Sequence, residues 1–123
     1  MRRLWCFAVL AVFCTTHSYG EELSDPAAGE KIFIMCVGCH SNKAEHRPTG
    51  PNLYGLVGRQ AGTLEGFQYS SALKDSGIFW DERTLDEFIA NPGARILGTM
   101  MLVGVGNPQD RASLIQYLNT LKE

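Results

Sequence analysis

Five consecutive residues constrain this chain more than any others: Cys36-Val37-Gly38-Cys39-His40. The string Cys-x-x-Cys-His is typical of a c-type haem attachment site. Two thiols three residues apart lie on one helical turn, so both can reach one edge of the macrocycle. The residue that follows offers an imidazole to the iron. The sequence therefore predicts one covalently bound haem c, attached through Cys36 and Cys39, with His40 as an axial ligand.

The same two cysteines are compatible with other chemistry. In an oxidising compartment they could close a disulfide of the thioredoxin type, and a Cys/His set could hold zinc. A thioredoxin-like site lies beside a βαβ pattern, and no such pattern surrounds Cys36, whereas a histidine follows Cys39 directly. The motif therefore favours haem over a redox dithiol or a zinc site.

The first twenty residues have the layout of a cleavable signal peptide. Arg2 and Arg3 form a positive n-region, residues 4–14 are apolar, and Ser18-Tyr19-Gly20 offers small residues before a cut. The apolar stretch is short for a membrane span. We therefore expect residues 1–20 to be removed and residues 21–123 to form one domain in the periplasm.

Two alternatives to removal after Gly20 exist. The segment could be retained as a membrane anchor, or the chain could be a lipoprotein cut before Cys14. The second alternative is disfavoured because bulky Phe13 stands where a small residue is needed. Cys6 and Cys14 both lie in this segment, so only the two motif cysteines remain in the mature chain.

The charge balance argues against nucleic acid as a partner. The chain has 11 Lys and Arg and 13 Asp and Glu; without Arg2 and Arg3, nine basic residues remain, a net charge near −4. Nucleic-acid binding requires a basic surface, and a mildly acidic chain gives no reason to expect one.

Helix signals mark both ends of the domain, and no segment alternates like a strand. Asp25-Pro26 joins an N-cap acceptor to a proline at the first helical position, and predicts a helix that runs to about Cys39. Asn107-Pro108 repeats the signal before a last helix. That helix carries its apolar stripe on Leu114, Ile115, Leu118 and Leu121.

The middle of the chain predicts two short helices and two loops. One helix is expected over Tyr69–Ser76, ended by Gly77, and another from about Arg83 to Ala90, begun by Asp81 and stopped by Asn91-Pro92. Residues 41–67 and 91–106 are expected to be loops. Loops of that length need something to organise them, and a bound haem would do so. The fold class is therefore predicted to be all-α.

Met100 and Met101 are the candidates for the second axial ligand. They lie in a glycine-flanked loop about sixty residues after His40. A thioether is a soft ligand that favours ferrous iron, so His/Met ligation raises the reduction potential. Methionine is otherwise a common core filler, and only the upstream haem motif favours the ligand role.

Several short segments occur in a characteristic order: Gly29-Glu30-Lys31-Ile32-Phe33, Cys36 to His40, Thr49-Gly50-Pro51-Asn52-Leu53-Tyr54-Gly55-Leu56, Gly58-Arg59, Gly66-Phe67-Gln68-Tyr69, Gly77-Ile78-Phe79-Trp80, Asn91-Pro92, Gly98-Thr99-Met100-Met101 and Arg111 to Leu118. With them the chain resembles the class I cytochromes c, in particular the mitochondrial and alphaproteobacterial type, from about Gly29 to the C-terminus. The resemblance implies that the N- and C-terminal helices cross, with loops and short helices wrapped around one haem.

The resemblance also assigns residues. The family motif Gly-Thr-Lys-Met implies that Met101 binds the iron, with Met100 at a usually exposed lysine. The Pro51 carbonyl is expected to accept the other ring N–H of His40. The positions that hold the haem propionates are matched by Arg59, Tyr69, Trp80 and Thr99. Without the resemblance, Tyr69 and Trp80 could be core aromatics and Arg59 a solvated charge.

Departures from the family concern the docking face and the methionine side. Met35, Met100, Asn107 and Pro108 stand at or beside positions where relatives carry lysines. Since those lysines steer relatives onto acidic partners, we expect a weakly charged or apolar face, with Met35, Met100 and Val103 near the haem edge.

Three other departures change the methionine side itself. Phe88 replaces a tyrosine that bonds the methionine sulfur, Leu73 replaces a polar residue, and Leu97 replaces a proline that stiffens the loop. The first two remove hydrogen bonding from the pocket, and the third predicts a more mobile loop.

Together these features predict a monomeric single-electron carrier of the periplasm. It would shuttle electrons from a cytochrome bc complex to a terminal oxidase or reductase, and would meet membrane complexes only transiently. No nucleophile or carboxylate pair suggests an enzyme. If Met101 dissociates readily, the alternative is a haem peroxidase or gas-binding protein. A dedicated electron-accepting subunit of a dehydrogenase is a third possibility, slightly favoured by an apolar face.

Overall fold

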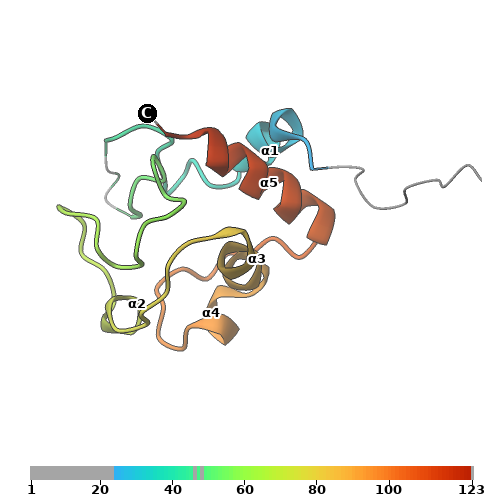
Figure 1. Ribbon diagram of the computed structural model, residues 1–123. Coiled ribbons are helices and arrows are strands. Elements are labelled where there is room, and N and C mark those ends of the chain that lie inside the picture. The colour runs from blue at the N-terminus through green and yellow to red at the C-terminus, as the bar shows by residue number, and fades with distance from the viewer. Residues whose placement is uncertain (1–23, 46, 48, 123) are drawn as a thin grey trace, which may run out of the picture.

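The computed structural model describes residues 24–45, 47 and 49–122. The predicted signal peptide, residues 1–20, lies outside them, so its removal stays a prediction. Within the described residues the chain forms five helices: α1 (Pro26–Phe33), α2 (Ser71–Lys74), α3 (Glu82–Ala90), α4 (Pro92–Arg95) and α5 (Pro108–Thr120) (Figure 1). Extended pairing in this part of the chain is limited to a single bridge between Gln60 and Phe79. The all-α prediction is confirmed.

The two terminal helices pack against each other at close range, as Figure 1 shows for α1 and α5. Gly29 makes this approach possible, because a Cβ there would lie 2.0 Å from the backbone oxygen of Ser113. The rings of Phe33 and Tyr117 meet across the same contact, with centroids 5.4 Å apart. The predicted crossing of the terminal helices is therefore present, and it brings the end of α1 onto the core.

Helix α1 ends at Phe33, so the prediction that it runs to about Cys39 was wrong. Beyond Phe33 the backbone forms tighter turns of the 3₁₀ type. The N–H of Met35 donates to the carbonyl of Ile32, and the N–H of Cys36 donates to that of Phe33, three residues back in each case. Ile34 and Met35 are exposed, at 72% and 58%. These two side chains are not among those that pack on the core, so they give a longer α-helix no support from tertiary packing, which supplies most helical stability.

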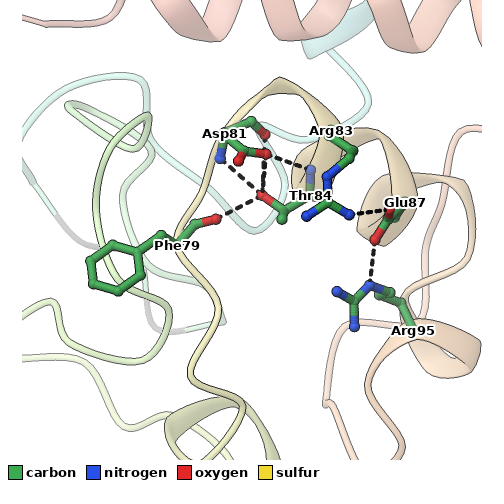
Figure 2. A network of polar contacts seen from close by, with 6 residues as sticks. All are labelled: Phe79, Asp81, Arg83, Thr84, Glu87 and Arg95. Carbon is green, nitrogen blue, oxygen red and sulfur yellow. Dashed lines mark hydrogen bonds and ion pairs between the residues drawn. The ribbon is translucent and has the colours of Figure 1, made fainter.

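Helix α3 begins as the sequence predicts, with Asp81 as its N-cap. The Asp81 carboxylate accepts from the N–H of Thr84 at 2.7 Å, and the Asp81 N–H donates back to the Thr84 hydroxyl at 2.9 Å (Figure 2). This reciprocal pair is a capping box. The same hydroxyl also donates to the Phe79 carbonyl, which ties the incoming chain to the helix.

The other two short helices differ from the prediction. Helix α2 is shorter than Tyr69–Ser76, because the Ser70 hydroxyl caps it by accepting from the N–H of Leu73. Helix α4 was not predicted, because Asn91-Pro92 was taken only as a stop. The Asn91 side chain accepts from the N–H of Ala94, so the same dipeptide that ends α3 also begins α4.

The core lies where α5 meets α1 and α3. Leu114, Ile115 and Leu118 of α5 are 2–3% exposed, and Phe33 and Leu85 of the other two helices are equally buried. None of the helices in the described part of the chain has the length and apolar character that crossing a membrane requires.

Candidate haem site

The predicted site residues converge on one cavity of about 350 Å³, a size typical of ligand sites. All nine line it: Cys36, Cys39, His40, Pro51, Arg59, Tyr69, Trp80, Thr99 and Met101. Leucines of the core, among them Leu85, Leu114 and Leu118, form part of the remaining wall. The cavity is therefore largely apolar, with a few polar groups from segments far apart in the sequence.

The two cysteines lie on a tight turn that directs the motif toward the cavity. The carbonyl of Cys36 accepts from the N–H of Cys39 at 3.1 Å and from that of His40 at 2.8 Å. Both thiols are free. Burial, with the neighbouring Cys39 second, raises the pKa of the Cys36 thiol. A dithiol oxidoreductase needs a lowered thiol pKa, so this environment does not favour the thioredoxin-like alternative.

The orientation of the His40 ring is fixed by Pro51 and Gly50. Its Nδ1 lies 2.7 Å from the carbonyl oxygen of Pro51. Since a carbonyl only accepts, Nδ1 carries the proton, and Nε2 keeps the lone pair that a metal needs. Burial lowers the pKa of His40, opposed by the Pro51 bond. Burial, the larger effect, favours the neutral imidazole, and the bond to Pro51 orients it.

Gly50 completes this support, although sequence reasoning did not single it out. A Cβ at Gly50 would lie 2.8 Å from Cε1 of the His40 ring and 2.7 Å from the Cys39 carbonyl oxygen. Only glycine therefore lets the chain lie against the imidazole. The motif Thr49-Gly50-Pro51 was the available signal, but the contact itself depends on the folded loop.

The polar side of the cavity is formed by Arg59 and Tyr69. Arg59 donates to the carbonyls of Asn52 at 3.0 Å and Tyr54 at 3.3 Å. Burial lowers the pKa of the Arg59 guanidinium, while Tyr69 opposes the shift. Burial also raises the pKa of the Tyr69 phenol, opposed by Arg59 and by the backbone of Leu64. Among the described lining residues Arg59 is the single lysine or arginine, so it is the cation available to a bound carboxylate.

Trp80 and Thr99 are both buried beside this group. Trp80 is 6% exposed, and its ring centroid lies 5.1 Å from that of Phe88. The Thr99 hydroxyl accepts from the N–H of Met101 at 3.4 Å. Trp80 is therefore also a core aromatic, the alternative role that the sequence left open for it. Thr99 helps to position the backbone of Met101.

The two candidate methionines differ in burial. Met100 is 66% exposed, whereas Met101 is half-buried and packs on the core. Phe88 and Leu73 line the same cavity with apolar side chains. Both methionines line the cavity, but Met101 alone packs on the core, which favours it over Met100 as the thioether available to a bound iron.

Arg111 anchors the end of the methionine loop and was missed from the sequence. Its Nε donates to Asp86 at 2.7 Å, and one terminal nitrogen donates to the carbonyls of Val105 and Gly106 at 3.0 and 2.9 Å. The residue is 8% exposed. Its position three residues before Leu114, on the buried stripe of α5, was the available signal, because a buried charge requires partners.

The donor set fits a haem better than a bare metal ion. Within the described residues, no group of three or more His, Cys, Asp and Glu side chains could hold an ion, which leaves the zinc alternative without support. Two thiols, a neutral imidazole, a thioether and one cation around an apolar cavity match the attachment, ligation and charge of a haem.

Comparison with known proteins agrees with this chemistry. Residues 26–122 match the family model described as cytochrome c. The chain is 47% identical over 98 residues to a cytochrome c2 of Rhodomicrobium vannielii, covering 78% of each chain. It is 46% identical to a cytochrome c of Ginkgo biloba, covering 76% of this chain and 86% of that one. Among solved structures, cytochrome cH from Methylobacterium extorquens is 40% identical, with a TM-score of 0.74, covering 78% of this chain and 98% of the other.

Proposed function

The chain belongs to the cytochrome c family, and we propose that it is a periplasmic electron carrier whose haem iron is bound by His40 and Met101. Proteins of this family carry one covalently attached haem c and transfer electrons; they are not enzymes. The observation that carries the proposal is the convergence of two thiols, an imidazole and a half-buried thioether on one apolar cavity.

Cys36 and Cys39 would attach the haem, and His40 would bind its iron through Nε2. The bound haem supplies one-electron chemistry by cycling between ferric and ferrous iron. Pro51 and Gly50 hold the imidazole in one tautomer and one orientation. A ligand that cannot rotate keeps its geometry in both oxidation states, which favours fast electron transfer.

Met101, which lines the same cavity, would supply a soft ligand that favours the ferrous state. Thr99 holds its backbone, and Phe88 and Leu73 keep the surrounding wall apolar. The haem propionates would be held by hydrogen bonds and charge from four residues that line the cavity: Arg59, Tyr69, Trp80 and Thr99.

The proposed partners are redox proteins of the respiratory chain. A cytochrome bc complex would reduce the carrier, and a terminal oxidase or reductase would oxidise it. A dehydrogenase that uses the chain as its dedicated acceptor is the alternative, and stable co-purification with this chain would distinguish it. The carrier is proposed to be monomeric and to meet membrane complexes only transiently.

The optical spectrum of the purified ferric haem protein tests the ligand set. We expect a weak sulfur-to-iron charge-transfer band at the red edge, with slow uptake of added cyanide. Met101→Ala should abolish the band and speed cyanide binding, whereas Met100→Ala, the matched control one residue away, should leave both unchanged. A wild-type protein without the band, which binds cyanide or CO rapidly, would contradict the proposal and favour the gas-binding alternative.

A further inference from the structure

Four large apolar side chains stand exposed where the cavity opens. Met35 is 58% exposed, Met100 66%, Leu102 83% and Val103 64%, and all four also line the cavity. We call these four residues the apolar rim. Exposed apolar groups that cluster at a site, rather than scatter singly, mark interaction surfaces.

The apolar rim lies in two stretches of chain that contain no charged residue. Residues 32–42, which contain Met35, include no Lys, Arg, Asp or Glu, and neither do residues 96–109, which contain the other three. The residues that flank these stretches are three basic ones, Lys31, Lys43 and Arg95, and the acidic Asp110; Arg95 is paired with Glu87. The two stretches that carry the rim therefore bring no lysine, arginine or carboxylate of their own to the surface that an approaching protein meets.

We propose that the apolar rim is the docking surface for a redox partner protein whose own docking surface is apolar and uncharged. This inference rests on the proposed function, since it takes the cavity to hold the haem. Carboxylates of an acidic partner would lose water against the rim without gaining a cation, which is unfavourable. An apolar counter-surface would gain from burial of the same four side chains.

Two other occupants fit the rim less well. Segments that bind membrane surfaces combine an amphipathic helix with a basic polar face, whereas the rim lies outside the helices, and the two stretches of chain that carry it contain no lysine or arginine. A stable dimer contributes about 20–30 residues from each copy, many more than the rim supplies. A small apolar contact suits a short-lived complex, which a carrier needs in order to leave after transfer.

Voltammetry of the haem protein on coated gold electrodes tests the chemistry of the partner directly. One electrode carries a methyl-terminated alkanethiol layer and the other a carboxylate-terminated layer of equal length. We expect electron exchange about tenfold faster on the methyl surface, with little change between low and high salt. The double variant Met35→Gln, Leu102→Asn replaces apolar groups by uncharged polar ones of similar shape, and should slow exchange on the methyl surface about tenfold.

Leu97→Gln is the matched control for the double variant. Leu97 is 84% exposed in the same loop but does not line the cavity, so this variant should behave like the wild type. Unchanged reduction potentials and charge-transfer bands would show that the haem environment is intact in all three proteins.

The contrary outcomes separate the two proposals. Equal exchange on both surfaces, or exchange on carboxylate that falls steeply with salt, would overturn the apolar rim and leave the electron carrier standing. No exchange with either electrode or with dissolved ferricyanide would overturn the proposed function, and the rim with it. A wild-type dimer in sedimentation, or binding to phosphatidylcholine vesicles, that the double variant loses would assign the rim to a second copy or to lipid and overturn the inference.

Discussion

On the side of the cavity that carries His40, contacts close in the sequence hold the proposed iron ligand, whereas the side that carries Met101 is held mainly at the ends of a loop. The N–H of His40 donates to a carbonyl four residues back, and its ring donates to Pro51, eleven residues on. Gly50 lies against the ring itself. The backbone and the side chain of His40 are therefore both fixed within one short stretch of chain.

The methionine loop has support before and after the ligand but little beside it. In the described structure, the backbone from Met100 to Gly104 makes one hydrogen bond, from Met101 to Thr99. At the far end, the N–H of Val105 donates to Ile89, and Arg111 holds the next carbonyls. The difference shows that the His40 side and the Met101 side of the cavity depend on different parts of the fold. We therefore expect the methionine side to open at a lower free energy than the histidine side.

Gly29→Ala should have the largest effect on stability, because it disrupts the contact between α1 and α5, on which both sides of the cavity depend. The new Cβ would lie 2.0 Å from the Ser113 carbonyl oxygen and 2.8 Å from Cβ of Tyr117, so α1 and α5 must separate. We expect the free energy of unfolding to fall by about 3 kcal/mol. Urea titrations followed by far-UV circular dichroism and by the charge-transfer band should shift together.

Gly38→Ala is the matched control for this change, since a Cβ there meets nothing within 4 Å. It lies between the two cysteines and should alter the free energy of unfolding by less than about 0.5 kcal/mol. Equal losses in the two glycine variants would contradict the assigned role of the close helix contact.

Arg111→Met should destabilise the methionine side of the cavity and leave the histidine side unchanged. The change leaves the Val105 and Gly106 carbonyls and Asp86 without their cation. Breaking a buried ion pair costs about 3–5 kcal/mol, but the Asp86 side chain is 46% exposed, so we expect about 2 kcal/mol. The charge-transfer band should disappear at a lower urea concentration than the helical signal, which would separate the opening of the loop from global unfolding.

Arg83→Met serves as the control for Arg111→Met. Arg83 pairs with Glu87 across one turn of α3, but its side chain is 72% exposed. Such pairs contribute less than about 0.5 kcal/mol, so both signals should stay close to those of the wild type. If the band and the helical signal of Arg111→Met shift by the same amount, the loop does not open separately.

The sequence predicted best those features that local chemistry determines. Asp25-Pro26 and Asn107-Pro108 begin helices α1 and α5 because a cap and a proline act within one turn. The end of α1 and the whole of α4 were predicted wrongly, because both depend on which neighbouring residues the fold buries. A pattern of residue types does not contain that information.

The same division applies to the site. The thiols, imidazole and thioether were identifiable from a motif and a resemblance. The approach of Gly50 to His40 and the contacts of Arg111 join residues that only the folded chain brings together. Each side therefore has one supporting contact that the sequence did not reveal, Gly50 beside His40 and Arg111 at the end of the methionine loop.

Leu97→Pro should narrow the difference between the two sides. Leu97 is exposed, and Ile96 before it has φ −135° and ψ 97°, the extended region that a residue before proline prefers. A proline that fits stabilises by about 0.5–1 kcal/mol through the unfolded chain. Cyanide, which requires an open methionine side, should bind the ferric protein about two- to fivefold more weakly. Leu97→Ala should give no such gain; tighter cyanide binding in Leu97→Pro would mean that the proline distorts the loop.

Glu87→Gln should have the smallest effect on stability, and this effect should appear only in how the stability changes with pH. The Glu87 carboxylate accepts from Arg95 of α4 at 2.8 Å and from Arg83 at 2.7 Å, so it ties the start of the methionine loop to α3 (Figure 2). The bond from Arg95 first, and that from Arg83 after it, hold the pKa of Glu87 below its ordinary value of 4.5.

A carboxylate whose pKa is lower in the folded state stabilises the fold fully above the unfolded value, and this stabilisation is lost as the pH falls through the folded one. The urea midpoint of the wild type should therefore fall more between neutral pH and about pH 3 than that of Glu87→Gln, which has no carboxylate to protonate. Because the pair is exposed, high salt should reduce the difference. Glu65→Gln, an exposed carboxylate with no ion pair in the described structure, should keep the full acid loss of the wild type. If it instead matches Glu87→Gln, general charge repulsion causes the acid sensitivity, and the tie between α3 and the methionine loop does not contribute to it.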